Sequence, residues 1–129
     1  MRAIDTNILV RYLVRDDVVQ AGQAEAILST ACFLPLTVLL ETVWLLASRY
    51  SLSRTQIAQA LQEVLKLSSV ATQDDAVVAW AIERFGAGAD FADMIHLLSA
   101  HSASSFVTFD RKLARLAGAG APLPIETLA

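Results

Sequence analysis

Two acidic residues come directly after predicted strands, where their carboxylates can do chemistry. Asp5 follows a short apolar run at the N-terminus, and Asp110 follows the strand-like residues 105–109. The carboxyl ends of parallel strands meet at one edge of an open α/β sheet, where such folds bind ligands. Thr6 and Asn7 follow Asp5 and open a helical pattern. We therefore expect a functional edge organised around Asp5, with two small polar side chains beside it.

A third acid, Glu41, lies in an apolar helical run. It is the one charged residue between Glu25 and Arg49. Burying an ionised carboxylate costs free energy unless a cation or hydrogen bonds hold it. Two interpretations follow: Glu41 lies on a thin solvent-exposed stripe of an amphipathic helix, or it serves a site.

Asp90 and Asp93 lie three positions apart, which places both carboxylates on one helix face. Asp90 follows a Gly-Ala loop and occupies the position of a helix N-cap. Asp93 interrupts an apolar helical run, which favours a functional role. Asp110 can cap the next helix or bind a ligand, and the two roles are compatible.

Carboxylates gathered in one place repel one another, and protonation or a bound cation relieves the repulsion. The chain has one cysteine, Cys32, and two histidines, so a cysteine-clustered zinc site and an internal disulfide are excluded. An all-oxygen site favours a hard cation, Mg²⁺ or Mn²⁺. Such ions activate water and neutralise phosphate in hydrolysis.

The elements that must position these acids alternate between strands and helices. With 129 residues we expect one domain. Asp16–Asp17, Thr37 and Ser53 (with Gln56) are the predicted helix caps. We expect strands at residues 3–4, 33–34, 70–72, 105–109 and near 125, and helices at 8–13, 20–31, 37–48, 53–65, 74–85, 90–98 and 111–116. Strands joined by helices predict a mostly parallel sheet covered on both faces.

Composition constrains partners and location. The chain is 55% hydrophobic and 18% charged, which indicates a large core or an apolar partner surface; the helices at 20–31 and 37–50 are the candidates. The net charge of −3 gives no general attraction to nucleic acid, so binding to nucleic acid would rely on metal ions or on local basic side chains.

We expect no signal peptide, no membrane span and a cytoplasmic location. Basic residues near the first and last acids can contact phosphates, bind acids of a partner or be solvated: Arg11, Arg15, Arg111 and Lys112.

These motifs, Asp5–Thr6–Asn7, Glu41, residues 91–95 and residues 108–111, together resemble the PIN-domain ribonucleases, and specifically the VapC-like toxins of type II toxin–antitoxin pairs. The resemblance covers essentially the whole chain, residues 1–129. It implies a three-layer α/β/α fold with a mostly parallel central sheet of four to five strands.

The resemblance also implies a function and a site. Asp5, Glu41, Asp93 and Asp110 would coordinate Mg²⁺ or Mn²⁺, Thr6 or Asn7 would orient the first acid, and Asp90 can add to the site. The family cleaves single-stranded or loop RNA, forms homodimers and is silenced by a cognate antitoxin protein.

Other polar and aromatic residues carry less specific expectations. His96, one helical turn beyond Asp93, departs from the small or apolar residue expected there; it is hydrogen-bonded in place or reaches the site. His101 is expected at the surface. Trp44 and Trp80 lie in apolar helices, which favours core or interface positions over base stacking.

Two other functions compete with the ribonuclease. A phosphoacceptor signalling domain has a similar length and α/β composition, but it needs an acceptor aspartate after a mid-chain strand, and residues 70–73 offer none. A PIN-like binding module without catalysis is the second alternative, and the presence of all four acids argues against it.

Overall fold

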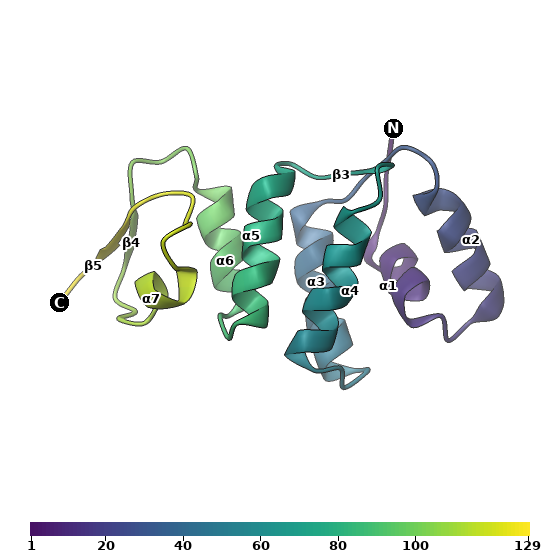
Figure 1. Cartoon of the computed structure of the whole chain (residues 1–129), viewed down its shortest axis with the longest axis horizontal. Coiled ribbons are helices and arrows are strands. Elements are labelled where there is room, and N and C mark those ends of the chain that lie inside the picture. The colour runs from purple at the N-terminus through teal and green to yellow at the C-terminus, as the bar shows by residue number, and fades with distance from the viewer. The chain divides into compact units, whose positions relative to one another are not determined.

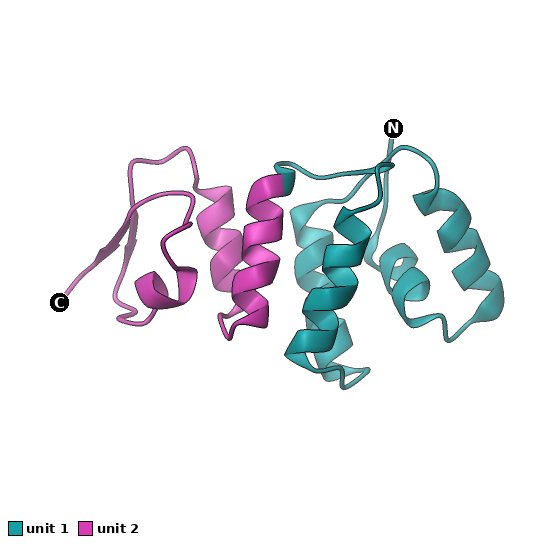
Figure 2. Cartoon of the chain, in the orientation of Figure 1, with its two compact units in different colours: residues 1–75 teal, residues 76–129 magenta.

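The computed structural model describes residues 1–129 as seven helices and five strands. The chain forms two compact units, Met1–Asp75 and Ala76–Ala129, shown in teal and magenta in Figure 2. Asp5 and Glu41 belong to the first unit, and Asp90, Asp93 and Asp110 belong to the second.

The first unit contains a three-stranded parallel sheet. Strands β1 (Arg2–Ala3), β2 (Cys32–Phe33) and β3 (Val70–Ala71) pair in that order, with Cys32 opposite both Arg2 and Val70. The strand predicted at residues 33–34 begins one residue earlier. Leu34 still donates its backbone N–H to the Ala71 carbonyl at 2.9 Å, so the pairing extends past β2.

Four helices connect and cover these strands: α1 (Thr6–Val14), α2 (Val18–Leu28), α3 (Leu36–Ser48) and α4 (Arg54–Leu65). Helix α1 packs against α2 and α3, and α3 packs against α4 (Figure 1). Seven large apolar side chains of these helices are fully buried: Leu9, Leu28, Leu39, Leu46, Ile57, Leu61 and Val64.

Helix starts follow the local capping chemistry. The Asp17 carboxylate accepts the Gln20 N–H at 3.0 Å, and Ser53 forms a complete capping box with Gln56, as predicted. The prediction that Thr37 caps its helix is wrong. Pro35 occupies that position without a side-chain bond, because its extended backbone (φ −64°, ψ 148°) suits the residue before a helix.

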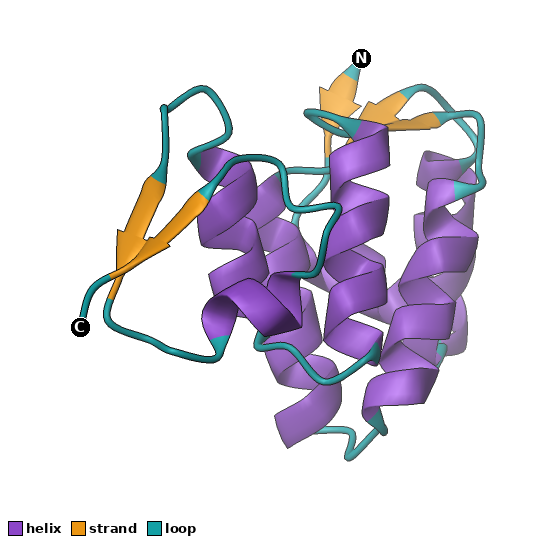
Figure 3. Ribbon diagram, turned by 60° about the vertical axis from the view of Figure 1, so that its left-hand side comes forward, coloured by secondary structure: helices purple, strands orange, loops and turns teal.

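The second unit combines three helices with a two-stranded parallel sheet. Helix α5 (Asp75–Gly86) begins at the last residue of the first unit and is followed by α6 (Phe91–Ser99), β4 (Phe106–Thr108), α7 (Leu113–Ala117) and β5 (Ile125–Thr127) (Figure 3). Strands β4 and β5 pair directly, with Val107 opposite Glu126.

Side chains of α5 hold the second unit together. The Phe85 and Phe91 rings meet edge to face, with centroids 5.6 Å apart. Trp80 donates its indole N–H to the Ala117 carbonyl at 3.0 Å, and Arg84 donates to the Leu116 carbonyl at 2.7 Å. Trp80 is half-buried, and its indole fixes α7 to α5.

The α/β class and the parallel pairing are confirmed, since every strand pair is parallel. The five strands predicted from the sequence are present, but they form hydrogen-bonded sheets of three and two strands. None of the helices combines the length and the apolar character that crossing a bilayer requires.

Candidate functional site

Asp5 lies between the end of β1 and the start of α1. It is the N-cap of α1, and its Oδ1 accepts the backbone N–H of Ile8 at 3.1 Å. This bond uses one oxygen and fixes the side chain at the helix N-terminus, where a negative charge is stabilised. Oδ2 makes no hydrogen bond, and the carboxylate is exposed. The sequence predicted the place of Asp5 between a strand and a helix, but not its role as the N-cap.

Glu41 comes close to this position through the packing of α3 against α1. The Thr6 hydroxyl donates a hydrogen bond to Glu41 Oε1, and Thr6 is buried, with only 8% of the residue exposed. Glu41 itself is exposed, so it is on the solvent side of its helix, and a buried hydroxyl also holds it. Thr6 was expected to orient Asp5; it orients Glu41 instead. Asn7 is exposed and makes no side-chain hydrogen bond.

In the second unit, Asp90 and Asp93 form the start of α6. Asp90 is the N-cap, and its Oδ1 accepts the Asp93 backbone N–H at 3.0 Å, as predicted. Asp93 is half-buried in the first helical turn. Burial raises the pKa of the Asp93 carboxyl, and the charges of Asp90 and Asp110 raise it further, while His96 lowers it. Three carboxylates of this unit therefore interact electrostatically.

Asp110 is held by the turn that follows β4. Its Oδ1 accepts the Lys112 backbone N–H at 2.9 Å, and its own N–H donates to Thr108 Oγ1 at 3.0 Å. The prediction that Asp110 caps the next helix is wrong: α7 begins at Leu113 with Lys112 as its N-cap, so the Asp110 side chain closes the turn before the helix. The carboxylate is exposed, so its second oxygen remains accessible for a ligand.

The histidines differ in their surroundings. His96 is exposed and has no hydrogen-bond partner, so the expectation that it is hydrogen-bonded in place is wrong. Its lowering effect on the Asp93 pKa places it near that carboxylate. His101 is at the surface, as predicted, and its Nδ1 lies 2.8 Å from the Leu98 carbonyl oxygen.

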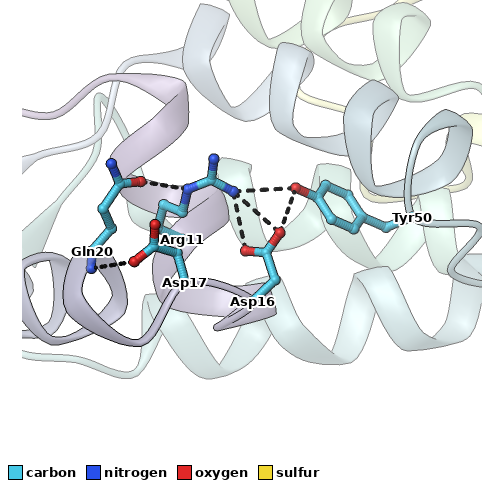
Figure 4. Close-up of polar contacts among 5 residues, drawn as sticks. All are labelled: Arg11, Asp16, Asp17, Gln20 and Tyr50. Atoms are coloured by element: carbon cyan, nitrogen blue, oxygen red, sulfur yellow. Dashed lines mark hydrogen bonds and ion pairs between the residues drawn. The ribbon is translucent and has the colours of Figure 1, made fainter.

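The basic residues divide into paired and unpaired groups. Arg11 contacts Asp16, Gln20 and the Tyr50 hydroxyl (Figure 4), and Arg15 forms a 2.9 Å ion pair with Glu25. The acids near these two arginines are thus residues of the same chain. Arg111 and Lys112 are exposed and make no side-chain ion pair or hydrogen bond, so their charges are available to a phosphate.

Each unit supplies carboxylates suited to a divalent ion. No three His, Cys, Asp or Glu side chains within either unit are arranged as a complete metal site. Magnesium in proteins is typically held by one or two carboxylates, with water and substrate phosphates completing its shell. The donor set here is carboxylate oxygen, and the crowding around Asp93 is the kind of negative charge that a cation relieves. The residues present therefore fit Mg²⁺ or Mn²⁺.

Residues that the sequence did not single out lie beside Asp5. A pocket of about 200 Å³ is lined by Asp5, Asn7, Ile8, Arg11, Gln20 and Gln23. Two glutamines three apart in a helix look like a solvated surface in the sequence. Only the packing of α2 against α1 brings them to Asp5.

Comparison with known proteins adds family membership to this geometry. The family model described as PIN domain matches residues 3–119. A search of curated proteins found no match. The matched range spans both compact units and includes all four predicted acids. Because one family model accounts for most of the chain, the protein belongs to the PIN-domain family, whose members are generally nucleases that use divalent metal ions.

Proposed function

We propose that the protein is an Mg²⁺- or Mn²⁺-dependent endoribonuclease and the toxin of a type II toxin–antitoxin pair. The observation that carries this proposal is the hydrogen bond from Thr6 to Glu41. It joins an acid-bearing helix to the residue next to Asp5, although the two lie far apart in the sequence. Because the buried Thr6 hydroxyl donates to the exposed Glu41 carboxylate, that carboxylate is held in a defined position.

The four acids have complementary roles in this proposal. Asp5 and Glu41 in the first unit, and Asp93 and Asp110 in the second, act on one phosphodiester, which the single family match across both units supports. Asp90 fixes the backbone of Asp93 through its cap and adds negative charge there. A bound divalent ion would supply charge neutralisation and an activated water.

RNA is the proposed substrate, and hydrolysis would leave 5′-phosphate and 3′-hydroxyl ends. The net charge of −3 provides no general electrostatic attraction to RNA. Local contacts must supply the affinity instead. Arg111 and Lys112 support this, because both are unpaired and directly follow Asp110.

Exposed apolar side chains support a partner surface. Trp44 on α3 is 65% exposed, and Val18 and Val19 at the start of α2 are 86% and 70% exposed. Trp44 is therefore not a core residue, and an interface position remains the prediction for it. We propose that these exposed side chains contact a second copy of the chain or the cognate antitoxin.

The proposal is tested with Asp5→Asn. Asparagine retains the N-cap of α1, so the fold should persist while the charged ligand is lost. The variant should show no Mg²⁺-dependent cleavage of single-stranded RNA above the level seen with EDTA, and its expression should no longer arrest growth.

Glu63→Gln is the matched control, because it removes one carboxylate charge from an exposed position on α4 of the same unit, away from the pocket beside Asp5. It should cleave like the wild type. Full metal-dependent activity in Asp5→Asn, prepared free of contaminating nuclease, would rule out the assigned role. A wild-type chain that neither cleaves RNA nor gives heat on Mn²⁺ titration would instead favour a binding module without catalysis.

A further inference from the structure

The pocket beside Asp5 lies between α1 and the first half of α2, within the first unit. A second pocket of about 300 Å³ also contains Asp5 and Ile8 in its lining and continues along β1, with Arg2, Ala3, Ile4 and Ile27. The two depressions therefore adjoin at Asp5. A single strand of RNA that passes over the Asp5 carboxylate therefore has a depression on each side of that carboxylate.

The lining of the smaller pocket offers unpaired hydrogen-bonding groups. The side-chain amides of Asn7 and Gln23 make no hydrogen bond, and both residues are exposed. Ile8 contributes an apolar surface in the same lining. An apolar surface combined with free amides suits a flat heterocycle, which packs by its face and is recognised by its edge.

Gln20 differs from the other amides because its orientation is fixed. Its Oε1 accepts the Arg11 Nε–H at 2.7 Å, and its amide nitrogen points away from the guanidinium (Figure 4). Turning the amide over would bring two donors together, so Gln20 presents N–H donors to a ligand.

Arg11 is itself held in place. Its Nη1 contacts both carboxylate oxygens of Asp16, at 3.1 and 3.3 Å, and the Tyr50 hydroxyl at 3.4 Å (Figure 4). The Asp17 cap also fixes the backbone of Gln20 at 3.0 Å. The donor direction at Gln20 is therefore preorganised before any ligand binds, which lowers the entropic cost of recognition.

We infer that this pocket takes the base of the nucleotide next to the scissile phosphate of a single-stranded RNA, and that Gln20 and Gln23 select that base. The inference rests on the proposed ribonuclease function and adds a specificity determinant to it. Glutamine side chains distinguish bases through their edges, whereas phosphate contacts carry no sequence information. Gln20 donates to an acceptor on the selected base.

Gln20→Glu tests this inference on the full-length protein. The carboxylate keeps an acceptor for Arg11, so the fold is retained, but it replaces the N–H donors with an acceptor. Cleavage of a randomised single-stranded RNA pool, with the new 5′ ends sequenced, should show a base preference beside the cut. That preference should change by about tenfold or more in Gln20→Glu.

Gln59→Glu is the matched control, since Gln59 is exposed on α4 and does not line the pocket. It carries the same charge change and should leave the preference unaltered. An unchanged base preference in Gln20→Glu, with or without a uniform loss of rate, would overturn the inference. Thermal denaturation of both variants checks that they are folded.

A binding measurement separates this inference from the proposed function. Asp5→Asn labelled with ¹⁵N is titrated with single-stranded RNA trinucleotides of different sequence, and the side-chain amide signals of Gln20 and Gln23 are followed. Shifts that depend on the base support the pocket as a base-binding site, even if the wild type cleaves no RNA. Signals that stay in place while RNA cleavage is normal overturn the inference and leave the ribonuclease intact. If the glutamine amide signals do not move and the wild-type protein cleaves no RNA, both the base-pocket inference and the proposed ribonuclease function are overturned.

Discussion

At the scale of single residues, Thr6 is the clearest positioning group. It is buried at 8% exposure, follows the N-cap Asp5 and donates its hydroxyl to Glu41. The sequence placed Thr6 near the site but could not identify its partner, because the contact depends on how α3 packs against α1. Local signals therefore located the residue, and tertiary packing determined its role.

Thr6→Val should reduce cleavage about 10- to 100-fold, since valine keeps the buried shape but no longer holds Glu41. The loss of stability should be small, at most about 1 kcal/mol, because the accepting carboxylate is exposed. Rates at saturating Mg²⁺ and urea denaturation measure the two effects. Thr6→Ser retains the hydroxyl and should recover most of the activity; equal activity of the valine and wild-type proteins would contradict the role.

Asp93 carries a conflict between stability and function. Burial raises its pKa above the ordinary aspartate value, and Asp90 and Asp110 add to the rise. A carboxyl whose pKa is higher in the folded state favours folding most when protonated. Stability from this group is therefore greatest below the unfolded pKa, declines as the pH rises to the folded pKa, and stays lowered at pH 7.

Asp93→Asn should consequently raise the melting temperature in EDTA at pH 7, by about 1–3 °C, because solvent screens a half-buried charge. The gain should disappear at a pH below the aspartate range, where the wild-type group is protonated. Glu83→Gln, on the exposed side of α5, is the control and should show no such pH dependence. A destabilised Asp93→Asn at pH 7 would contradict the proposed crowding.

At the scale of elements, helix starts were the most predictable features. Asp17, Ser53 with Gln56, and Asp90 all cap the helices assigned to them, since a capping signal depends only on neighbouring residues. Thr37 failed as a cap because Pro35 begins the helix before it. The network that joins Arg11 to Gln20 and Tyr50 had no sequence signal, because it links three separate elements.

The capping box of α4 provides a test at this scale. Ser53→Ala should destabilise the protein by about 1 kcal/mol, since the Gln56 N–H loses its acceptor at 3.1 Å. Ser53→Asp keeps an acceptor and should have little effect. Chemical denaturation measures both, and RNA cleavage below the melting range should be unchanged in both. A stable Ser53→Ala would show that this box contributes nothing.

At the scale of the whole molecule, alternating strands and helices correctly predicted a parallel α/β fold of five strands. The pattern did not predict that the strands form hydrogen-bonded sheets of three and two, because pairing partners depend on contacts between distant segments. The acids show the same division. Each position at a strand or helix end was readable locally, whereas their joint use of one ion remains a proposal.

Paramagnetic broadening by Mn²⁺ tests that joint use most directly. Substoichiometric Mn²⁺ added to the ¹⁵N-labelled protein should broaden backbone signals around Asp5, Glu41, Asp93 and Asp110 together and in one saturable step. Asp5→Asn should weaken the broadening around all four acids, including those of the second unit. Broadening confined to the acids of one unit, or unaffected around Asp93 by the Asp5 substitution, would contradict a single shared metal site.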